Sequence, residues 1–434
     1  MKKLIASDPA FYRKLGQFAA DEKQRGELEA TVKEVLEQVR QRGDSAVLEY
    51  TRKFDGFRST AQGLKVDPSS LKAAESALSP AQRKEIRSAI RCVRDFHKKG
   101  LPSNWMAKNP HGARVGERWY PISRVGIYIP AGNVPLVSTA VMTTTLARLA
   151  GVKSIAVSTP ANREGKISQQ MLAGLSLCGV SEVYRIGGAQ AIAAMAFGTK
   201  TIEPVLKIMG PGNAYVAEAQ RQVFGQVGID LLPGPSEALA IADGTAKPHY
   251  LAADLLAQAE HGSGRERVYF VYTNEAQARK VEAEAERMIP TLGHAEAVRK
   301  IWKTRTCFIK VSNISQAIEV ANFIAPEHLE LHVDKVLLPR LLQDIQTAGA
   351  ILCGHDTPTV IGDFTAGPSH TLPTSRTGRF FSGLKITDFM RRSSIVQYDQ
   401  DSLKKARNGV RVFSELEALD AHGQSMEIRF PESS

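Results

Sequence analysis

Apolar positions recur at helical spacing through most of the first hundred residues. Between residues 27 and 54 they are Leu28, Val32, Val35, Leu36 and Val39, and between residues 80 and 99 they are Ile86, Ile90, Val93 and Phe96. Steps of three and four residues place such side chains on one face of a helix. The pattern therefore predicts a mainly helical N-terminal region. It is preceded, over residues 1–25, by a polar arm with one weak helix.

Near residue 120 the pattern changes to short apolar runs that alternate with helical segments. The expected strands cover residues 123–130, 154–158, 183–186, 207–209, 238–242, 267–273 and 350–353. The expected helices cover residues 138–150, 167–177, 191–196, 250–261 and 274–289, with another from the turn at 210–213 through residue 223. Strands that alternate with helices form right-handed βαβ units on a mainly parallel sheet.

The length of the chain adds a second domain to this picture. At 434 residues it exceeds the size at which a single hydrophobic core normally keeps growing. We therefore predict an α/β fold with two Rossmann-like domains on mainly parallel sheets, plus small N- and C-terminal arms. The segment after Gly383 is expected to be a loop and one helix, an appendage without a core of its own.

Composition indicates an ordinary globular protein. The chain is 43% hydrophobic and 23% charged, and no run approaches the roughly 20 apolar residues that cross a bilayer. Its first residues are basic but lack the apolar stretch of a secretory signal. The four cysteines are scattered singly, so neither a disulfide framework nor a thiolate zinc site is indicated. We expect a cytoplasmic protein with no membrane partner.

The formal net charge is +11, but lysine and arginine are spread along the chain. Aromatic residues do not alternate with them, as a face that binds single-stranded nucleic acid would require. A nucleic-acid partner is therefore not expected. A basic solvated surface explains the charge, and a positive field that attracts an anionic ligand such as a dinucleotide stays open.

Three glycine-rich turns connect expected strands to expected helices. They are Pro130-Ala-Gly132, Gly187-Gly188 and Gly210-Pro-Gly212-Asn213. Backbone N–H groups at a helix N-terminus favour phosphate, although many α/β turns need glycine only to bend. Neither the Rossmann fingerprint nor a Walker A motif is present. The turns allow dinucleotide binding without establishing it.

Four short segments each pair a histidine with an oxygen-bearing side chain. The pairs are Gln258 with His261, Glu327 with His328, Asp363 with His370, and Glu417 with His422. Taken alone, each has an ordinary explanation: a histidine at a helix end, a carboxylate at a helix start, a polar turn, or a solvated helix. Imidazole with oxygen ligands also suits zinc, and a histidine beside a glutamate suits proton transfer. The hypothesis is a zinc site with a glutamate and histidine acid/base pair beside it.

Together these segments resemble the histidinol dehydrogenase family, from about residue 25 to the end. The most specific stretches are residues 210–216 (GPGNAYV), 234–237 (GPSE), 254–261 (DLLAQAEH), 325–331 (APEHLEL) and 362–374 (GDFTAGPSHTLPT). Their occurrence in this order is highly specific for the superfamily.

The resemblance implies a role for each matching residue. Four match zinc ligands: Gln258, His261, Asp363 and His422. Two match the acid/base pair: Glu327 and His328. Three match further substrate contacts (Ser236, His370 and Glu417), and the zinc ligands and His328 are expected to line the substrate as well. Three match NAD contacts: Tyr128, Gln190 and Asn213.

The implied reaction is the oxidation of L-histidinol to L-histidine through an aldehyde, with two NAD reduced. His328 would take the alcohol proton, and Glu327 would activate the water that hydrates the aldehyde. Zinc would position the small-molecule substrate, and NAD would carry the redox chemistry. In the family, the histidine equivalent to His422 reaches across a homodimer, so a site shared between subunits is expected.

The expected domains follow from the same resemblance. After the arm at 1–25, the first α/β domain would be discontinuous, over residues 26–127 and 237–382, and would carry the zinc and catalytic residues. The NAD-binding domain would cover residues 128–236. A C-terminal arm, swapped between subunits, would cover residues 383–434.

The chain departs from the family pattern at three places. Ala131-Gly132 stands where Gly-Gly is usual, Phe364 where tyrosine is common, and Ser375-Arg376 where Gly-Gly is usual. An arginine at 376 could meet an anionic group of the substrate. A related NAD-dependent dehydrogenase that acts on another small alcohol, such as sulfopropanediol, is therefore the alternative.

Overall fold

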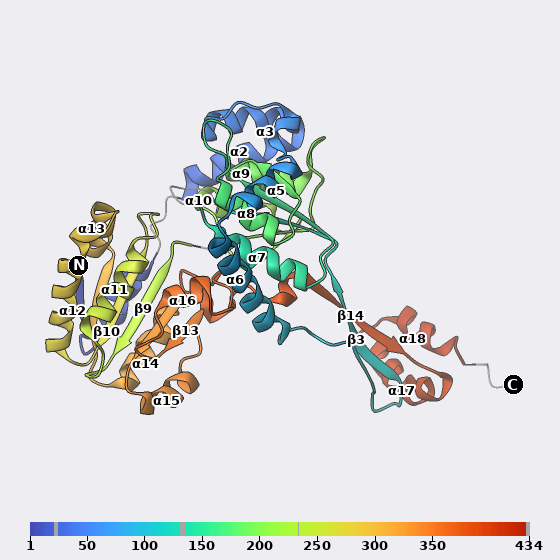
Figure 1. Ribbon diagram of the computed structural model, residues 1–434. Coiled ribbons are helices and arrows are strands. Elements are labelled where there is room, and N and C mark those ends of the chain that lie inside the picture. Colours follow the sequence, from blue (N-terminus) through green and yellow to red (C-terminus); the bar gives the residue numbers. More distant parts are fainter. Residues whose placement is uncertain (21–24, 131–134, 233, 431–434) are drawn as a thin grey trace. The chain divides into compact units, whose positions relative to one another are not determined.

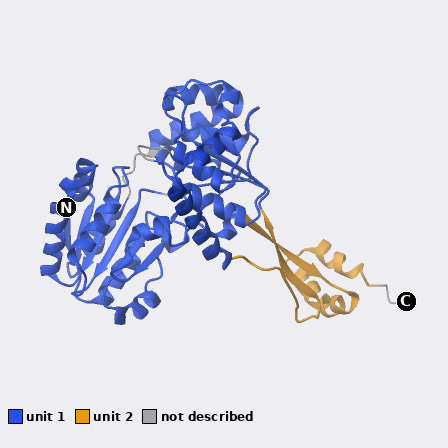
Figure 2. Cartoon of the chain, in the orientation of Figure 1, with its two compact units in different colours: residues 1–100, 122–389 blue, residues 101–121, 390–434 orange. Residues whose placement is uncertain are grey.

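The computed structural model describes residues 1–20, 25–130, 135–232 and 234–430 (Figure 1). The chain divides into two compact units (Figure 2). Unit 1 contains residues 1–100 and 122–389, and unit 2 contains residues 101–121 and 390–434. Both parallel sheets belong to unit 1, so the predicted α/β fold class is confirmed. The domain boundaries expected from the sequence stay a prediction.

A six-stranded parallel sheet has the strand order β1-β11-β10-β9-β12-β13. Its strands are β1 (Lys2–Ile5), β9 (Glu237–Ala242), β10 (Arg267–Tyr272), β11 (Thr306–Lys310), β12 (His328–His332) and β13 (Ala350–Cys353). The segment expected as a polar arm thus supplies an edge strand, because Lys2–Ile5 pairs with β11.

Helices cover both faces of this sheet. Alternate strand residues such as Leu239, Leu329 and Leu331 enter one core, with α1 (Phe11–Ala19), α14 (Ile314–Ile324) and α15 (Leu338–Asp344). The other face, with Phe270 and Phe308, packs against α11 (Pro248–Ala259), α12 (Glu275–Met288) and α13 (Ala295–Thr304). Burial on both faces explains why these strands are nearly continuous apolar runs rather than alternating ones. The short helix α16 (Thr359–Phe364) follows β13.

A five-stranded parallel sheet has the order β6-β5-β4-β7-β8. Its strands are β4 (Arg124–Tyr128), β5 (Ser154–Thr159), β6 (Glu182–Arg185), β7 (Lys207–Met209) and β8 (Gly228–Ile229). The helices around it are α2 (Arg25–Arg42), α3 (Asp44–Tyr50), α4 (Ala61–Leu64), α5 (Pro68–Ala77), α6 (Pro80–Lys98), α7 (Val137–Leu149), α8 (Gln169–Leu177), α9 (Gly188–Phe197) and α10 (Ala214–Val223). The N-terminal region is helical as predicted, and residues of α2, α3 and α4 share a core with this second sheet.

The start of α6 shows how the local sequence fixes an element. Ser79 accepts a hydrogen bond from the backbone N–H of Gln82, and the Gln82 side chain accepts one from the backbone of Ser79. Pro80 occupies the first helical position, where no backbone donor is needed. This capping box satisfies two N–H groups that the helix itself leaves unpaired.

Unit 2 differs from the expected loop and single helix. Strand β14 (Met390–Gln397) pairs antiparallel with β3 (Arg114–Pro121), which pairs with β2 (Trp105–Lys108). Two helices follow, α17 (Gln400–Leu416) and α18 (Asp420–Glu427), and Ala418 between them has a φ of +51°. The strand was missed because its partner lies about 275 residues earlier in the chain, beyond the reach of a local pattern.

Within the described ranges, every helix is too short or too polar to cross a membrane.

Candidate functional site

Strand β12 presents a polar face inside the protein. Successive strand residues point to opposite faces, so Leu329 and Leu331 enter the core while His328, Glu330 and His332 share the other side. Beside them in register on β9 stand Ala238, Ala240 and Ala242. Alanines leave room for α11 to approach this face. The polar side chains are thereby enclosed rather than exposed to solvent, and all three are buried.

Residues from α11 and α16 meet the start of this strand. The His328 Nε2 lies 3.6 Å from the Asp363 Oδ1 of α16. The His370 Nδ1 donates to the Asp363 carbonyl oxygen at 3.1 Å. Gln258 lies in the last turn of α11, and His261 lies just beyond its end, where the Nδ1 donates to the Gln258 carbonyl oxygen at 3.2 Å. This bond leaves the Nε2 of His261 as the nitrogen available to a metal.

The Gln258 side chain tests whether these residues fit a metal ion. It is 2% exposed, and neither its Oε1 nor its Nε2 has a hydrogen-bond partner among the described residues. Buried carboxamides normally have partners, so these atoms indicate a ligand of the functional protein. A carboxamide oxygen, an imidazole and a carboxylate are donors that zinc accepts. Gln258, His261 and Asp363 therefore fit the predicted zinc site.

Burial raises the pKa of Glu327 and lowers the pKa of His328. The Glu327 Oε2 accepts a hydrogen bond from the Glu237 backbone N–H at 2.8 Å, and the Ser236 side chain also bonds to this carboxyl. Burial raises the pKa of Glu327 well above its ordinary value, and the charges of Glu237 and Asp363 add to this effect. Burial, with His261 and His370 nearby, lowers the pKa of His328 to about 3. The imidazole is therefore neutral near pH 7, which is the form that a general base must have before it reacts.

A buried ion pair supports this corner of the site, and sequence reasoning missed it. The Arg267 Nη1 lies 3.2 Å from the Glu237 Oε1, and both side chains are 1% exposed. Because the Glu237 backbone bonds Glu327, the pair helps to fix the carboxyl of Glu327. Neighbouring positions at the starts of β9 and β10 bring the two partners together, which the sequence alone does not reveal.

Two of the predicted NAD contacts lie together at the five-stranded sheet. The hydroxyl of Tyr128, the last residue of β4, accepts a hydrogen bond from the Gly188 backbone N–H at 3.1 Å. Gln190 is fully buried one turn into α9, and its Oε1 has no partner among the described residues. Asp55, which was not predicted, accepts a hydrogen bond from the Gly187 N–H at 3.2 Å.

The third predicted NAD contact lies at the next helix start. Asn213 caps α10, with its Oδ1 accepting from the backbone N–H groups of Tyr215 and Val216. Gly210, with a φ of +105°, approaches the Tyr128 carbonyl so closely that a Cβ would lie 2.2 Å from it. The chain reverses its winding between β4 and β7, and ligands of open α/β sheets bind beside such switch points. The residues beside this switch point fit a dinucleotide.

The remaining predicted residues lie in unit 2 or beside the unit 1 cluster. Glu417 ends α17 and His422 belongs to α18, so they do not share the single helix that was expected. Both are exposed within unit 2. Ser236 and His370 belong to unit 1, close to Glu327 and Asp363 respectively.

Two of the three departures from the family pattern have a structural description. The Arg376 guanidinium lies 4.2 Å from the centre of the Phe323 ring, and its Nε donates to the Phe323 carbonyl oxygen at 2.9 Å. Its cation is thus engaged at the end of α14. Phe364 is 54% exposed. Ala131-Gly132 lies outside the described residues.

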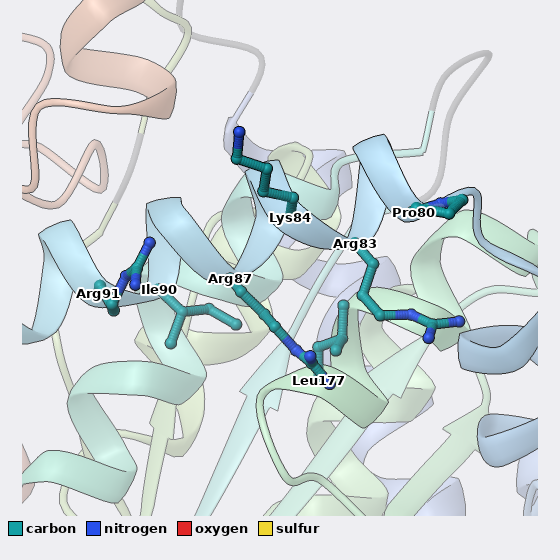
Figure 3. Close-up of a pocket in the computed structure, with 7 residues that line it drawn as sticks. All are labelled: Pro80, Arg83, Lys84, Arg87, Ile90, Arg91 and Leu177. Carbon is teal, nitrogen blue, oxygen red and sulfur yellow. The ribbon is translucent and has the colours of Figure 1, made fainter.

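A basic hollow along α6 is a separate feature, with a volume of about 580 Å³ (Figure 3). It contains none of the predicted site residues; its lining is Pro80, Arg83, Lys84, Arg87, Ile90, Arg91 and Leu177. Arg83 donates to the carbonyl oxygens of Glu75 and Ser76, and Arg87 lies 3.7 Å from the Glu75 carboxylate. Local partners therefore already occupy two of its cations.

Known proteins resemble the chain over nearly its whole length. A family model described as histidinol dehydrogenase matches residues 19–430. A protein of Agrobacterium fabrum named histidinol dehydrogenase is 42% identical over 425 residues, which cover 98% of each chain. One of the same name from Rhizobium meliloti is 41% identical over 423 residues, which cover 97% of this chain and 96% of that protein. The crystal structure of histidinol dehydrogenase from Elizabethkingia anophelis superposes with a TM-score of 0.94 at 31% identity, covering 99% of this chain and 98% of that one.

Proposed function

The chain belongs to the histidinol dehydrogenase family of oxidoreductases, and on that premise we propose that it oxidises L-histidinol to L-histidine through the aldehyde, with two NAD reduced. One observation carries the proposal. A neutral, buried imidazole at His328 lies 3.6 Å from the Asp363 carboxylate, with Glu327 and His261 close by, and the unpartnered carboxamide of Gln258 lies one helical turn before His261. A general base, a second proton acceptor and metal-binding donors are the groups that this reaction needs.

His328 acts in the first oxidation. Its neutral imidazole takes the hydroxyl proton of the alcohol as a hydride leaves the same carbon. Bound NAD accepts a hydride in each of the two oxidations. Tyr128, Gln190 and Asn213 are the proposed NAD contacts, a role supported by their place beside the switch point of the five-stranded sheet.

Glu327 acts between the two oxidations. Its raised pKa brings the carboxyl closer to the working pH, where the ionised form is a stronger base than an ordinary glutamate. It takes a proton from water while the hydroxide adds to the aldehyde carbon. The hydrate then transfers a hydride to the second NAD and becomes the carboxylic acid. The hydrogen bonds from Ser236 and Glu237 hold the carboxyl in place during these steps.

Gln258, His261, Asp363 and His422 are the proposed zinc ligands. Zinc would supply a fixed charge that positions the nitrogen atoms of the substrate. His370 is a proposed substrate contact, a role supported by its Nδ1 lying 4.0 Å from the Asp363 carboxylate. Glu417 is the remaining proposed substrate contact.

We further propose that His422 and Glu417 enter the site from a second copy of the chain. Unit 2 is consistent with burial against another subunit, since Phe413 is 65% exposed, Leu416 76% and Ile428 82%. Phe413 and Leu416 lie on α17 and Ile428 directly follows α18, and large exposed apolar side chains of this kind are typical of an association surface. A homodimer with two shared sites follows from the symmetry of such an exchange.

Mixing two inactive variants tests the shared site. Gln258→Ala and His422→Ala are each expected to be inactive as pure proteins. After unfolding and refolding as an equimolar mixture, half of the dimers are hybrids. In a hybrid, one site carries both changes and the other carries none. NADH formation with L-histidinol should therefore recover to about a quarter of the wild-type rate.

The matched control is the same mixture made with Gln258→Ala and Asp363→Ala, whose ligands come from one subunit. It should recover no activity, because every site keeps one defect. Equal recovery in both mixtures, or none in either, would contradict a site completed by the partner's His422.

The first test of the proposed activity is NADH production by zinc-loaded wild-type protein. Initial rates with L-histidinol are expected to exceed those with sulfopropanediol by at least about a hundredfold, because an anionic substrate needs a free cation and the Arg376 guanidinium is engaged with Phe323. Two NADH should appear for each histidinol consumed. Absorbance at the NADH band measures the rates, and chromatography identifies L-histidine.

The result that would reject the proposal is an absence of NADH with L-histidinol in protein shown to contain zinc. A faster rate with sulfopropanediol would instead support the alternative substrate. Arg376→Ala serves as the control, since its removal should leave histidinol oxidation nearly unchanged.

A further inference from the structure

The polar face of β12 continues past the proposed catalytic histidine. Glu330 and His332 follow His328 at alternate positions, and Asp254 lies opposite them on α11, one helical turn before Gln258. The His332 Nε2 lies 3.3 Å from the Glu330 Oε2 and 3.5 Å from the Asp254 Oδ2. We call Asp254, Glu330 and His332 the β12 triad. Sequence analysis did not single out any of its members.

The spacing of the triad suits a single ion. Its three donor atoms all lie within 4.8 Å of one another. Zinc binds nitrogen and carboxylate oxygen at roughly 2.0–2.2 Å, which places neighbouring ligand atoms about 3.4 Å apart in tetrahedral geometry. The two distances from His332 lie close to that value. Of the described residues, only this group has three histidine, cysteine or carboxylate donors in such an arrangement.

Hydrogen bonds do not satisfy every polar side-chain atom of the triad. The Nε2 of His332 carries at most one proton, which can serve one carboxylate at a time. Glu330 has other donors, because its Oε1 accepts from the backbone N–H of Thr359 at 2.9 Å and from the hydroxyl of Thr359 at 2.5 Å. Among the described residues, the neighbours of the Asp254 carboxylate are the other two members of the triad: the His332 Nε2 lies 3.5 Å away, and the donor atom of Glu330 lies within 4.8 Å. The Asp254 side chain is largely buried, with 13% of it exposed.

Because the triad is buried, polar atoms without hydrogen-bond partners there cost folding free energy. The side chains of His332 and Glu330 are 1% and 3% exposed. Burial, together with the charge of Glu330, raises the pKa of the Asp254 carboxyl. Two carboxylates at this depth repel each other unless a proton or a cation lies between them. A divalent cation would satisfy both carboxylates and the imidazole at once.

The strand order of the six-stranded sheet gives a second reason to expect a ligand beside the triad. The six-stranded sheet winds from β9 through β10 to β11, and then returns to place β12 on the other side of β9. Ligands of open α/β sheets gather outside the carboxyl ends of the strands at such a reversal. His332 is the last residue of β12 and pairs in register with Ala242, the last residue of β9. The residues of the proposed active site start β12 instead, at the opposite end.

We propose that Asp254, Glu330 and His332 bind a divalent metal ion in addition to the zinc of the proposed active site. One imidazole and two carboxylates suit a borderline ion such as Zn²⁺ or Mn²⁺. The two sites are close but separate, because the four residues from Asp254 to Gln258 rise about 6 Å along α11. The ion would join the middle of α11 to the carboxyl end of β12.

Metal counting on the full-length protein tests the inference. Protein freed of metal with a chelator is dialysed to equilibrium against a fixed concentration of free Zn²⁺, and zinc per chain is measured by plasma mass spectrometry. Wild type is expected to bind two ions per chain. Asp254→Asn and Glu330→Gln should each bind one, and so should Gln258→Ala. Glu286→Gln removes an exposed carboxylate of α12 as the matched control and should bind two.

The wild-type count and the pattern of loss among the variants decide the matter together, and two different triad variants guard against one that fails to fold. One ion per chain, lost in Gln258→Ala and kept in Asp254→Asn, would overturn the inference and leave the proposed active site intact. One ion lost in Asp254→Asn and kept in Gln258→Ala would support the triad and overturn the proposed zinc ligands. Two ions in wild type and in both triad variants would place the additional ion elsewhere and would also overturn the inference. Mn²⁺ paramagnetic resonance on the same proteins gives a second count.

Discussion

Replacing His328 by asparagine is expected to lower kcat for L-histidinol by about 10²–10⁴-fold, the usual contribution of a general base. Asparagine keeps a polar side chain of similar size but cannot accept the alcohol proton. The neutral imidazole beside Asp363 would be lost, while the unpartnered carboxamide of Gln258 would remain. Steady-state NADH formation measures the effect, and zinc content should stay at the wild-type value.

Glu327→Gln is the companion change, and it separates the two oxidations. The first hydride transfer should persist, whereas hydration of the aldehyde should slow. In a single turnover, NADH per substrate should fall from two toward one, with the aldehyde detectable by a carbonyl trap. Retention of two NADH at the wild-type rate would show that Glu327 does not activate water.

The control for both variants is His294→Asn, which changes an exposed histidine at the start of α13. It should leave NADH formation unchanged. If His328→Asn were as active as this control, the assignment of His328 as the base would be wrong. Loss of zinc together with activity in His328→Asn would instead point to a structural role.

Removing zinc with a chelator is expected to lower turnover by at least about a hundredfold, because a displacement of even 1 Å at a reacting centre has that effect. Adding zinc back should restore the rate. The Gln258→Ala variant should require far more zinc for the same rate. Loss of a direct ligand is expected to weaken binding by more than the roughly 10–100-fold that outer-shell partners contribute. Zinc titration of activity measures both effects.

Gln346→Ala offers a matched comparison, since it removes an exposed carboxamide that is not among the proposed ligands. Its zinc dependence should equal that of wild type. Full activity of metal-free wild-type protein would reject the positioning role of zinc. An unchanged zinc dependence in Gln258→Ala would remove Gln258 from the ligand set without affecting the assignment of His328.

Much of the fold could be predicted because it depends on local patterns. Short apolar runs alternated with helical segments from about residue 120 onward, and the two parallel sheets confirm the fold class inferred from them. Helix ends were less certain. The helix expected to reach His261 ends at Ala259, so Gln258 lies in the last turn and His261 lies beyond it.

Pairings across long separations could not be predicted from local patterns. Strand β14 pairs with β3, from residues about 275 positions earlier, and Lys2–Ile5 pairs with β11. The ordinary explanation considered for Glu327 was a carboxylate at a helix start, but the residue directly precedes a strand that begins at His328. A five-residue run that alternates histidine, leucine and glutamate has too few apolar positions to separate the two possibilities.

The sequence by itself determined the chemical types available to this protein: imidazoles, carboxylates and a carboxamide within family-specific stretches, on an alternating α/β chain. Only the tertiary structure decided which of them meet. Because β12 lies beside β9, and because the alanines of β9 leave space for α11, His328 meets Asp363 and the charge of His261 acts on both. The same adjacency brings Asp254 to Glu330 and His332. That neighbourhood depends on strand order, which is set by burial of both sheet faces and not by any local run of residues.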